Sequence, residues 1–189
     1  IILEVTVVTG VVSGPTFQRV FELSETRLGV VLGSIDIGML CVAILAGHIT
    51  YKHGSWFTLI GGLILNMAGI WLVCVSNGFL MLVGGLACIG ASAGLITNAN
   101  ATLLASLFPA KLTRIMSLAS ALWFGSSAFS APLVGMWLKA AKQSGYGQWS
   151  FQLPYLVCAG LIISGIVVSV IVLRKAEEKI AKEEANSDG

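Results

Sequence analysis

Residues 53–110 read HGSWFTLIGGLILNMAGIWLVCVSNGFLMLVGGLACIGASAGLITNANATLLASLFPA and contain no Asp, Glu, Lys or Arg. Residues 115–138 and 143–173 are equally free of charged side chains. A helix that crosses a bilayer needs about 20 predominantly apolar residues. Inside the hydrocarbon, a helix satisfies its own backbone polar groups. These runs therefore predict an all-α membrane protein with several spanning helices.

The composition of the whole chain agrees with this fold class. Its 189 residues are 56% hydrophobic and 11% charged, with a mean hydropathy of +0.90. Soluble domains carry about 25% charged residues, so the composition argues against a water-soluble fold. A net charge of +2 does not favour nucleic acid as a partner. The four cysteines lie singly in separate apolar runs, which argues against a disulfide scaffold.

Polar breaks divide residues 1–173 into six apolar segments, which predict a six-transmembrane-helix bundle. Because the chain begins with Ile inside an apolar run, we expect the first helix to be incomplete. Residues 174–189 read RKAEEKIAKEEANSDG and form a separate charged tail. The expected segments are 1–20, 28–49, 56–75, 79–107, 114–138 and 151–173.

Basic residues are distributed unevenly between the two sides of the predicted bundle. Cytoplasmic loops of membrane proteins carry an excess of Lys and Arg. We therefore expect a multi-pass protein of the cell membrane whose C-terminal tail is cytoplasmic. The richer side has seven basic residues, Lys52, Lys111, Arg114, Arg174, Lys175, Lys179 and Lys182, and the other has four, Arg19, Arg27, Lys139 and Lys142.

Small residues recur at helical spacing in three of the predicted helices. Residues at such offsets return to nearly the same face of a helix, and small faces let membrane helices approach closely. We therefore expect helices that cross tightly or slide at these faces. The faces comprise Gly29, Gly33, Asp36, Ala43 and Gly47; then Gly90, Gly94, Thr97 and Ala101; and finally Ser117, Ala121, Ala128, Ala131 and Gly135.

The polar end of the second segment has a specific spacing, in which Gly47 is followed by Tyr51, Lys52 and Gly54. It resembles the signature loop of the major facilitator superfamily, where a Gly is followed four residues later by Asp, then by Arg and another Gly. Tyr51 stands in the place of that Asp. Residues 90–109 look like the family's fourth helix, residues 131–135 are similar to the Gly-Pro-x-x-Gly pattern of its fifth, and residues 148–151 resemble the turn into its sixth.

A full transporter of that family has twelve helices in two six-helix halves, so the resemblance implies that this chain is one half. The segment order and a long extracellular link at residues 14–26 look like the N-terminal half, which we favour; a tail after the sixth helix fits the C-terminal half equally well. The resemblance places Gly47, Tyr51, Lys52 and Gly54 in a cytoplasmic gate. It also implies three partners: the lipid bilayer, a small-molecule solute and a second six-helix half, which is either a missing part of the same chain or a second copy.

Two departures from the family pattern bear on mechanism. Tyr51 removes a carboxylate that, in the family, helps to latch the cytoplasmic side. Gly84 and Gly85 lie near the position where proton-coupled members often carry an Arg. The resemblance therefore argues against the type of proton-driven antiport that uses this Arg.

Glu4 and Asp36 are the acidic residues inside the six apolar segments. An ionised group at the centre of a spanning helix costs roughly 2.5–3.5 kcal/mol on insertion scales, which makes such residues functional candidates. Asp36 lies on a small-residue face, so we expect it to point into the bundle and to handle substrate or a proton; a structural hydrogen bond is the alternative. Thr97 and Asn98 could line a polar cavity or bond a neighbouring helix. Glu4 is a further candidate for substrate or proton handling, or simply lies near the cytoplasmic interface.

No pattern in the sequence indicates an enzyme, a cofactor or a metal site. His48 and His53 are five residues apart and have no carboxylate nearby, so they do not form a metal pair. The sequence favours a secondary transporter that moves a small solute by alternating access. The scarcity of interior charge favours an uncharged solute or a monoanion. The alternative is a membrane interaction protein that derives from a transporter half and does not transport.

Overall fold

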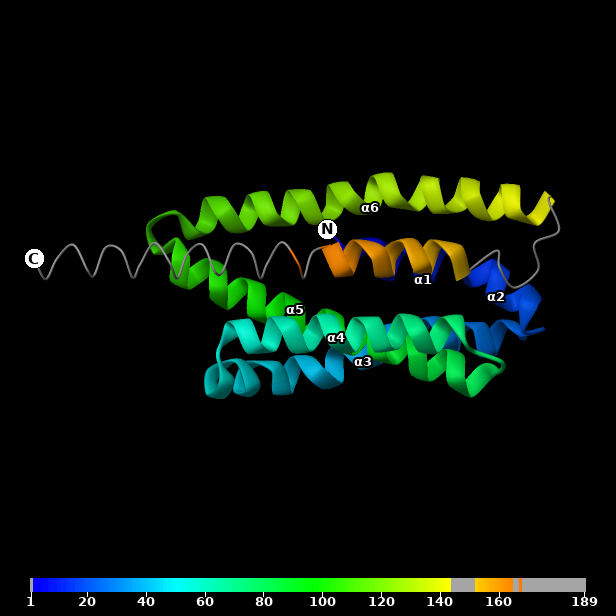
Figure 1. The fold of residues 1–189 in the computed structure, drawn as a ribbon, viewed down its shortest axis with the longest axis horizontal. Helices are drawn as coiled ribbons and strands as arrows, with labels where there is room; N and C mark the ends of the chain where they lie inside the picture. Colours follow the sequence, from blue (N-terminus) through cyan, green and yellow to red (C-terminus); the bar gives the residue numbers. More distant parts are fainter. Residues whose placement is uncertain (1, 144–151, 165–166, 168–189) are drawn as a thin grey trace, which may run out of the picture.

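The computed structural model describes residues 2–143, 152–164 and 167. These residues form long helices that lie side by side and alternate in direction, so that α3 and α5 run one way and α4 and α6 the other (Figure 1). The elements are α1 (Ile2–Val12), α2 (Gly14–Val20), α3 (Glu25–His53), α4 (Ser55–Cys74), α5 (Phe79–Leu107), the 3-10 turn η1 (Pro109–Lys111), α6 (Leu112–Gln143) and a helix at Gln152–Ser164.

Four runs within the described residues are long and apolar enough to cross a membrane: α3, α4, α5 and Pro109–Ala141. The expected count of six is not reached there. The first expected segment is divided between α1 and α2, and the sixth, at 151–173, lies partly outside the described residues. The charged tail at 174–189 lies wholly outside them. Six spanning helices therefore remain a prediction.

The first expected helix is divided at Ser13, and this division corrects the long link expected at residues 14–26. Pro15 has no backbone N–H and so cannot donate a helical hydrogen bond. It is tolerated in the first turn of α2, because an N–H at that position would have no acceptor within the helix. The Ser13 carbonyl accepts hydrogen bonds from the backbone N–H of Thr16 and Phe17, each at 2.9 Å. Because α2 occupies residues 14–20, the link between helices shrinks to residues 21–24.

The junction between α3 and α4 corrects a second expectation, the gate loop at residues 47–54. Gly47, Tyr51 and Lys52 are all helical, because α3 continues to His53. Gly54 alone separates α3 from α4, with a φ of 86° that favours glycine. The signature stretch is therefore the last two turns of a helix followed by a one-residue turn.

Helices α3 and α4 pack on opposite sides of α5 through glycines. A Cβ added to Gly90 would lie 1.9 Å from the carbonyl oxygen of Ile35, and one added to Gly38 would lie 2.1 Å from that of Ala87. The expectation of a tight crossing at Gly90 is therefore confirmed. Between α4 and α5, a Cβ on Gly69 would lie 2.9 Å from the carbonyl oxygen of Gly85. Backbones in direct contact make α3, α4 and α5 one three-helix body.

Helix α1 and the helix at 152–164 lie between most of α6 and this body (Figure 1). Helix α6 also contacts α5, through Trp123, which packs against Ala93 and Ile96. Val134 and Leu138 of α6 are buried against Tyr155 and Cys158, in a core that also contains Phe17. Pro132 lies inside α6 without ending it. On the side of the bundle that contains α6, the described helices thus share a core of packed side chains.

Candidate functional site

The Glu4 carboxyl lies inside the bundle, not at an interface with water. Glu4 is 8% exposed, and its Oε1 accepts a hydrogen bond from Ser127 Oγ of α6. Ser127 is at the middle of α6, so the pair lies at mid-depth of the bundle. The expectation of a place near the cytoplasmic interface is therefore wrong. Sequence reasoning missed Ser127, although the serines at 126, 127 and 130 form a polar group at helical spacing.

Asp36 has a different environment from the one predicted. It is exposed, on the side of α3 that turns away from the described neighbours. A Cβ added to Gly29, Gly33 or Gly47 on the same side would meet no described heavy atom within 4 Å. Asp36 therefore does not point into the bundle. We call Gly29, Gly33, Asp36 and Gly47 the open face of α3.

The small-residue face of α6 is also without a neighbour in the described residues. Ser117, Ala121 and Ala128 are exposed, and a Cβ on Gly135 would meet nothing within 4 Å. These four residues are the open face of α6. The predicted faces on α3 and α6 thus lie open except at Ala43, whose backbone N would be 3.4 Å from a Cβ on Gly94, and at Ala131, which is half-buried. The predicted face on α5 is closed against α3 at Gly90 and Gly94.

Thr97 and Asn98 lie on α5, apart from Asp36. Thr97 is exposed, and Asn98 donates a hydrogen bond from Nδ2 to the Gly94 carbonyl of its own helix at 3.1 Å. A Cβ on Gly94 would lie 2.9 Å from the Met39 carbonyl oxygen. Asn98 is one turn beyond Gly94, so it lies beside a later turn of α3. At 1.5 Å per residue, that turn is about 10 Å from Asp36 along the helix axis. The structure does not bring the two side chains together.

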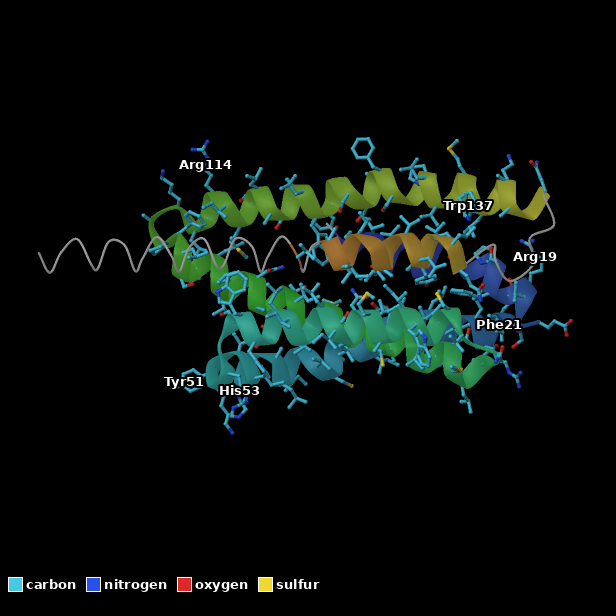
Figure 2. All side chains as sticks on the ribbon, in the orientation of Figure 1. Arg19, Phe21, Tyr51, His53, Arg114 and Trp137 are labelled. Atoms are coloured by element: carbon cyan, nitrogen blue, oxygen red, sulfur yellow. The ribbon has the colours of Figure 1, made fainter. Side chains whose placement is uncertain are left out.

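The predicted gate residues gather at one end of the bundle. Tyr51 and His53 lie at the same end as Arg114, whereas Arg19, Phe21 and Trp137 lie at the other (Figure 2). Tyr51 is 91% exposed. Lys52 and His53 occupy the last turn of α3, where positive charge complements the helix dipole.

A cavity of about 590 Å³ lies between α1, α6 and the helix at 152–164. Its lining is mostly apolar and includes Phe129 and Leu133, which are exposed on the outside of the bundle. Thr9, Ser126 and Ser130 are its hydroxyl groups. Val5 and Ser126, the immediate neighbours of Glu4 and Ser127, line it too, so the carboxyl pair lies beside this cavity.

Asn66 is a buried polar group without a hydrogen-bond partner in the described part of the chain. It lies on α4 and is 0% exposed, and neither amide atom has a hydrogen-bond partner among the described residues. An unpaired amide in an apolar interior costs about 1–3 kcal/mol by mutational measures. In the described part of the chain, no three His, Cys, Asp or Glu residues come together as a metal-binding group.

These features define a multi-pass helical protein of the lipid bilayer. The sequence model of the Major Facilitator Superfamily matches residues 2–188. The chain therefore belongs to this superfamily, whose members are membrane transporters and not enzymes. No curated protein matches the sequence significantly.

Proposed function

We propose that the protein is a secondary transporter that moves a small solute by alternating access, with this chain supplying one of two six-helix bundles. The open face of α3 is the observation that carries the proposal. Its opposite side is packed backbone to backbone on α5, whereas a Cβ added to Gly29, Gly33 or Gly47 would meet no described atom within 4 Å. Glycine faces suit close helix packing, so a second bundle is the expected neighbour.

A site between two bundles also suits the position of Asp36. A carboxylate exposed on a spanning helix is costly in lipid but tolerated in a water-filled cavity. Apposition of the open faces of α3 and α6 to a second bundle would remove Asp36 from lipid. Asp36 is then a substrate or proton contact, with Thr97 and Asn98 farther along the same side of the interface. The segment order favours the N-terminal half.

Reconstitution into liposomes tests the requirement for two bundles. The purified chain is assayed with labelled uncharged and monoanionic solutes, and its mass in detergent is measured in parallel. We expect no saturable uptake by a monomer, because one bundle supplies one wall of the cavity. Saturable uptake by a demonstrated monomer would contradict the proposal, and uptake by a dimer would revise it to a homodimeric transporter.

Asp36→Asn tests the site once transport is established. Because the side chain is exposed, we expect the variant to keep its thermal unfolding temperature and to lose most of its transport rate. Glu25→Gln, at the exposed first turn of α3, is the control and should transport normally. Normal transport by Asp36→Asn would exclude the role assigned to Asp36.

The protein is proposed to lie in the cell membrane, with its C-terminal tail in the cytoplasm. It predicts that the end of the bundle with Tyr51 and Arg114 is cytoplasmic, in keeping with the basic-residue bias. In a cysteine-free background, an impermeant thiol reagent outside cells should label Lys139→Cys and spare Tyr51→Cys. The opposite labelling would reverse the orientation.

The second candidate function, a non-transporting interaction protein, is favoured by one observation. Tyr51 is 91% exposed at the proposed gate, where the family pattern has an Asp. Tyr51→Asp separates the two functions. A transporter with an altered gate should change its transport rate, whereas a binding protein should show no transport with either residue.

A further inference from the structure

The cavity of about 590 Å³ between α1, α6 and the helix at 152–164 is a groove that opens to the outside of the bundle. Val5 and buried Thr9 of α1 form its floor. Phe129 and Leu133 on the α6 wall are 77% and 67% exposed, and Val157 on the opposite wall is 63% exposed. Its volume is within the range of about 300–1,000 Å³ that ligand pockets have. We call this cavity the apolar groove.

The hydroxyl groups that line the apolar groove donate their hydrogen bonds within their own helices. Thr9 Oγ1 donates to the Val5 carbonyl at 2.6 Å, and Ser126 Oγ donates to the Trp123 carbonyl at 2.7 Å. Ser130 Oγ donates to the carbonyl three residues before it, at 3.4 Å. A hydroxyl group has one proton to donate, so none of the three has a proton left for a ligand. A polar solute would leave its own groups unpaired here, whereas a hydrocarbon chain would not.

The apolar groove extends over one half of the span. On α6 it runs from Ser126 to Trp137, which is roughly 17 Å at 1.5 Å per residue. Ser126 adjoins Ser127 at the middle of α6, and Trp137 lies at the same end of the bundle as Arg19 (Figure 2). Half of a hydrocarbon core about 30 Å thick is about 15 Å. The groove therefore matches the depth of one leaflet.

The side of α6 on which the groove opens carries large apolar side chains. Leu118, Leu122, Phe129, Leu133 and Met136 share this side at helical spacing, and all are exposed. Membrane helices contact one another through small residues, so a row of large exposed side chains suits lipid instead. The open face of α6 lies roughly 110° around the helix at 3.6 residues per turn. A second bundle packed on that face would contact a different part of α6.

We propose that the apolar groove binds one acyl chain of a phospholipid from the leaflet at the end of the bundle with Arg19 and Trp137. The chain lies along the groove, and its methyl end is beside Val5 and Ser126 at mid-depth. This binding site does not depend on the proposed transport function, because it can be occupied and measured without any solute.

Dispersion contacts favour an acyl chain in the groove over an unfilled groove. An atom that borders a void loses the contacts that a neighbour would supply. In a bilayer, the molecules that reach the exposed walls at this depth are acyl chains. A chain in the groove contacts α1, α6 and the helix at 152–164 together. A chain on the outer surface of α6 contacts one helix, so the groove holds its chain more firmly.

Positive charge at the outer end of the groove suits the phosphate group of the same lipid. Lys139 is exposed two residues beyond Trp137, and Arg19 is exposed in the last turn of α2. Neither α2 nor α6 contains an acidic residue. Long basic side chains can bury their stems and place their charge at the interface. A phospholipid gains this attraction, whereas a sterol carries no charge.

Photochemical labelling of the full chain in phosphatidylcholine nanodiscs tests the site. The probe is a phosphatidylglycerol with a diazirine near the end of one acyl chain, and mass spectrometry of peptides locates the labelled residues. We expect label on Val5, which is half-buried at the floor of the groove. Leu133→Trp narrows the groove from one wall and should lose most of this label. Val157→Trp, on the opposite wall, should have the same effect.

The controls place the same large side chain outside the groove. Leu122→Trp alters an exposed leucine on the same side of α6 that does not line the groove. Leu156→Trp is the corresponding control beside Val157. Both variants should be labelled at Val5 as strongly as the unaltered chain.

Three results would overturn the site. Absence of label at Val5 in the unaltered chain would mean that another segment or a second copy covers the groove. Equal label at Val5 in Leu133→Trp and Leu122→Trp would mean that the label reports general contact with lipid. Stronger labelling of Val5 by a diazirine sterol than by the phospholipid would assign the groove to a sterol. If Leu133→Trp does not fold, Val157→Trp with Leu156→Trp provides the same comparison.

Discussion

The two sides of α3 differ in how closely their glycines are packed. On one side, a Cβ at Gly38 would lie 2.1 Å from the Ala87 carbonyl oxygen, and the Ile35 carbonyl group packs directly against Gly90. On the other, five residues from Gly38, a Cβ at Gly33 would meet nothing within 4 Å. The same residue type on one helix therefore serves two purposes. The closed side packs on α5, and the open side has no neighbour among the described residues.

The largest effect is expected from Gly38→Ala. The new methyl group would overlap a backbone carbonyl, and neither helix can yield without shifting its backbone. We expect a loss of about 3 kcal/mol or more, at or beyond the upper end of ordinary overpacking. Thermal unfolding followed by size-exclusion chromatography in detergent measures it. Gly33→Ala, on the open face of the same helix, is the matched control. Equal losses of stability in both variants would contradict the difference between the packed and open sides of α3.

A smaller effect is expected from a larger side chain on the open face of α3. Gly33→Leu should leave the stability of the isolated chain intact and weaken its association with a second bundle. The expected cost is about 1–3 kcal/mol, as for overpacking in a close interface. Fluorescence energy transfer between labelled bundles in liposomes measures the association. Gly84→Leu, at an exposed glycine of α5 with no described atom near its Cβ, is the control and should not weaken it.

The smallest effect is expected from Gly29→Ala. Alanine is favoured over glycine inside a helix by about 0.8–1.0 kcal/mol, and a Cβ at Gly29 meets no described atom within 4 Å. The isolated chain should therefore become slightly more stable to heat. A loss of stability in the isolated chain would show that this part of the open face is already covered.

The apolar pattern predicts the long helices well, because hydrophobicity and length decide which segments span. The expected 79–107 and 56–75 correspond to α5 at 79–107 and α4 at 55–74. Helix ends depend on local chemistry that the apolar pattern does not contain. Ser24 caps α3 by accepting from the Arg27 N–H, so α3 begins before the expected residue 28. Gly54 ends it after the expected residue 49.

The candidate site was harder to predict, because periodicity shows which residues share a face and not which face is packed. Asp36 does share a face with Gly29 and Gly33, but Gly38, which is not on that face, makes the close contact with α5. Glu4 and Ser127 are 123 residues apart in sequence. Only the packing of α1 on α6 brings them together.

The one-residue turn at Gly54 and the contiguity of α3, α4 and α5 bear on how the protein is made. All backbone contacts of the three-helix body lie within residues 25–107, so none of them requires a residue that is synthesised later. Chains fold as they emerge, at about 5–20 residues per second, which delays the completion of α6 by roughly 2–7 seconds. During that interval α3, α4 and α5 can insert and close their glycine contacts. Helix α6 is completed after these three helices have packed. The hydrogen bond from Ser127 to Glu4 therefore forms later than the glycine contacts.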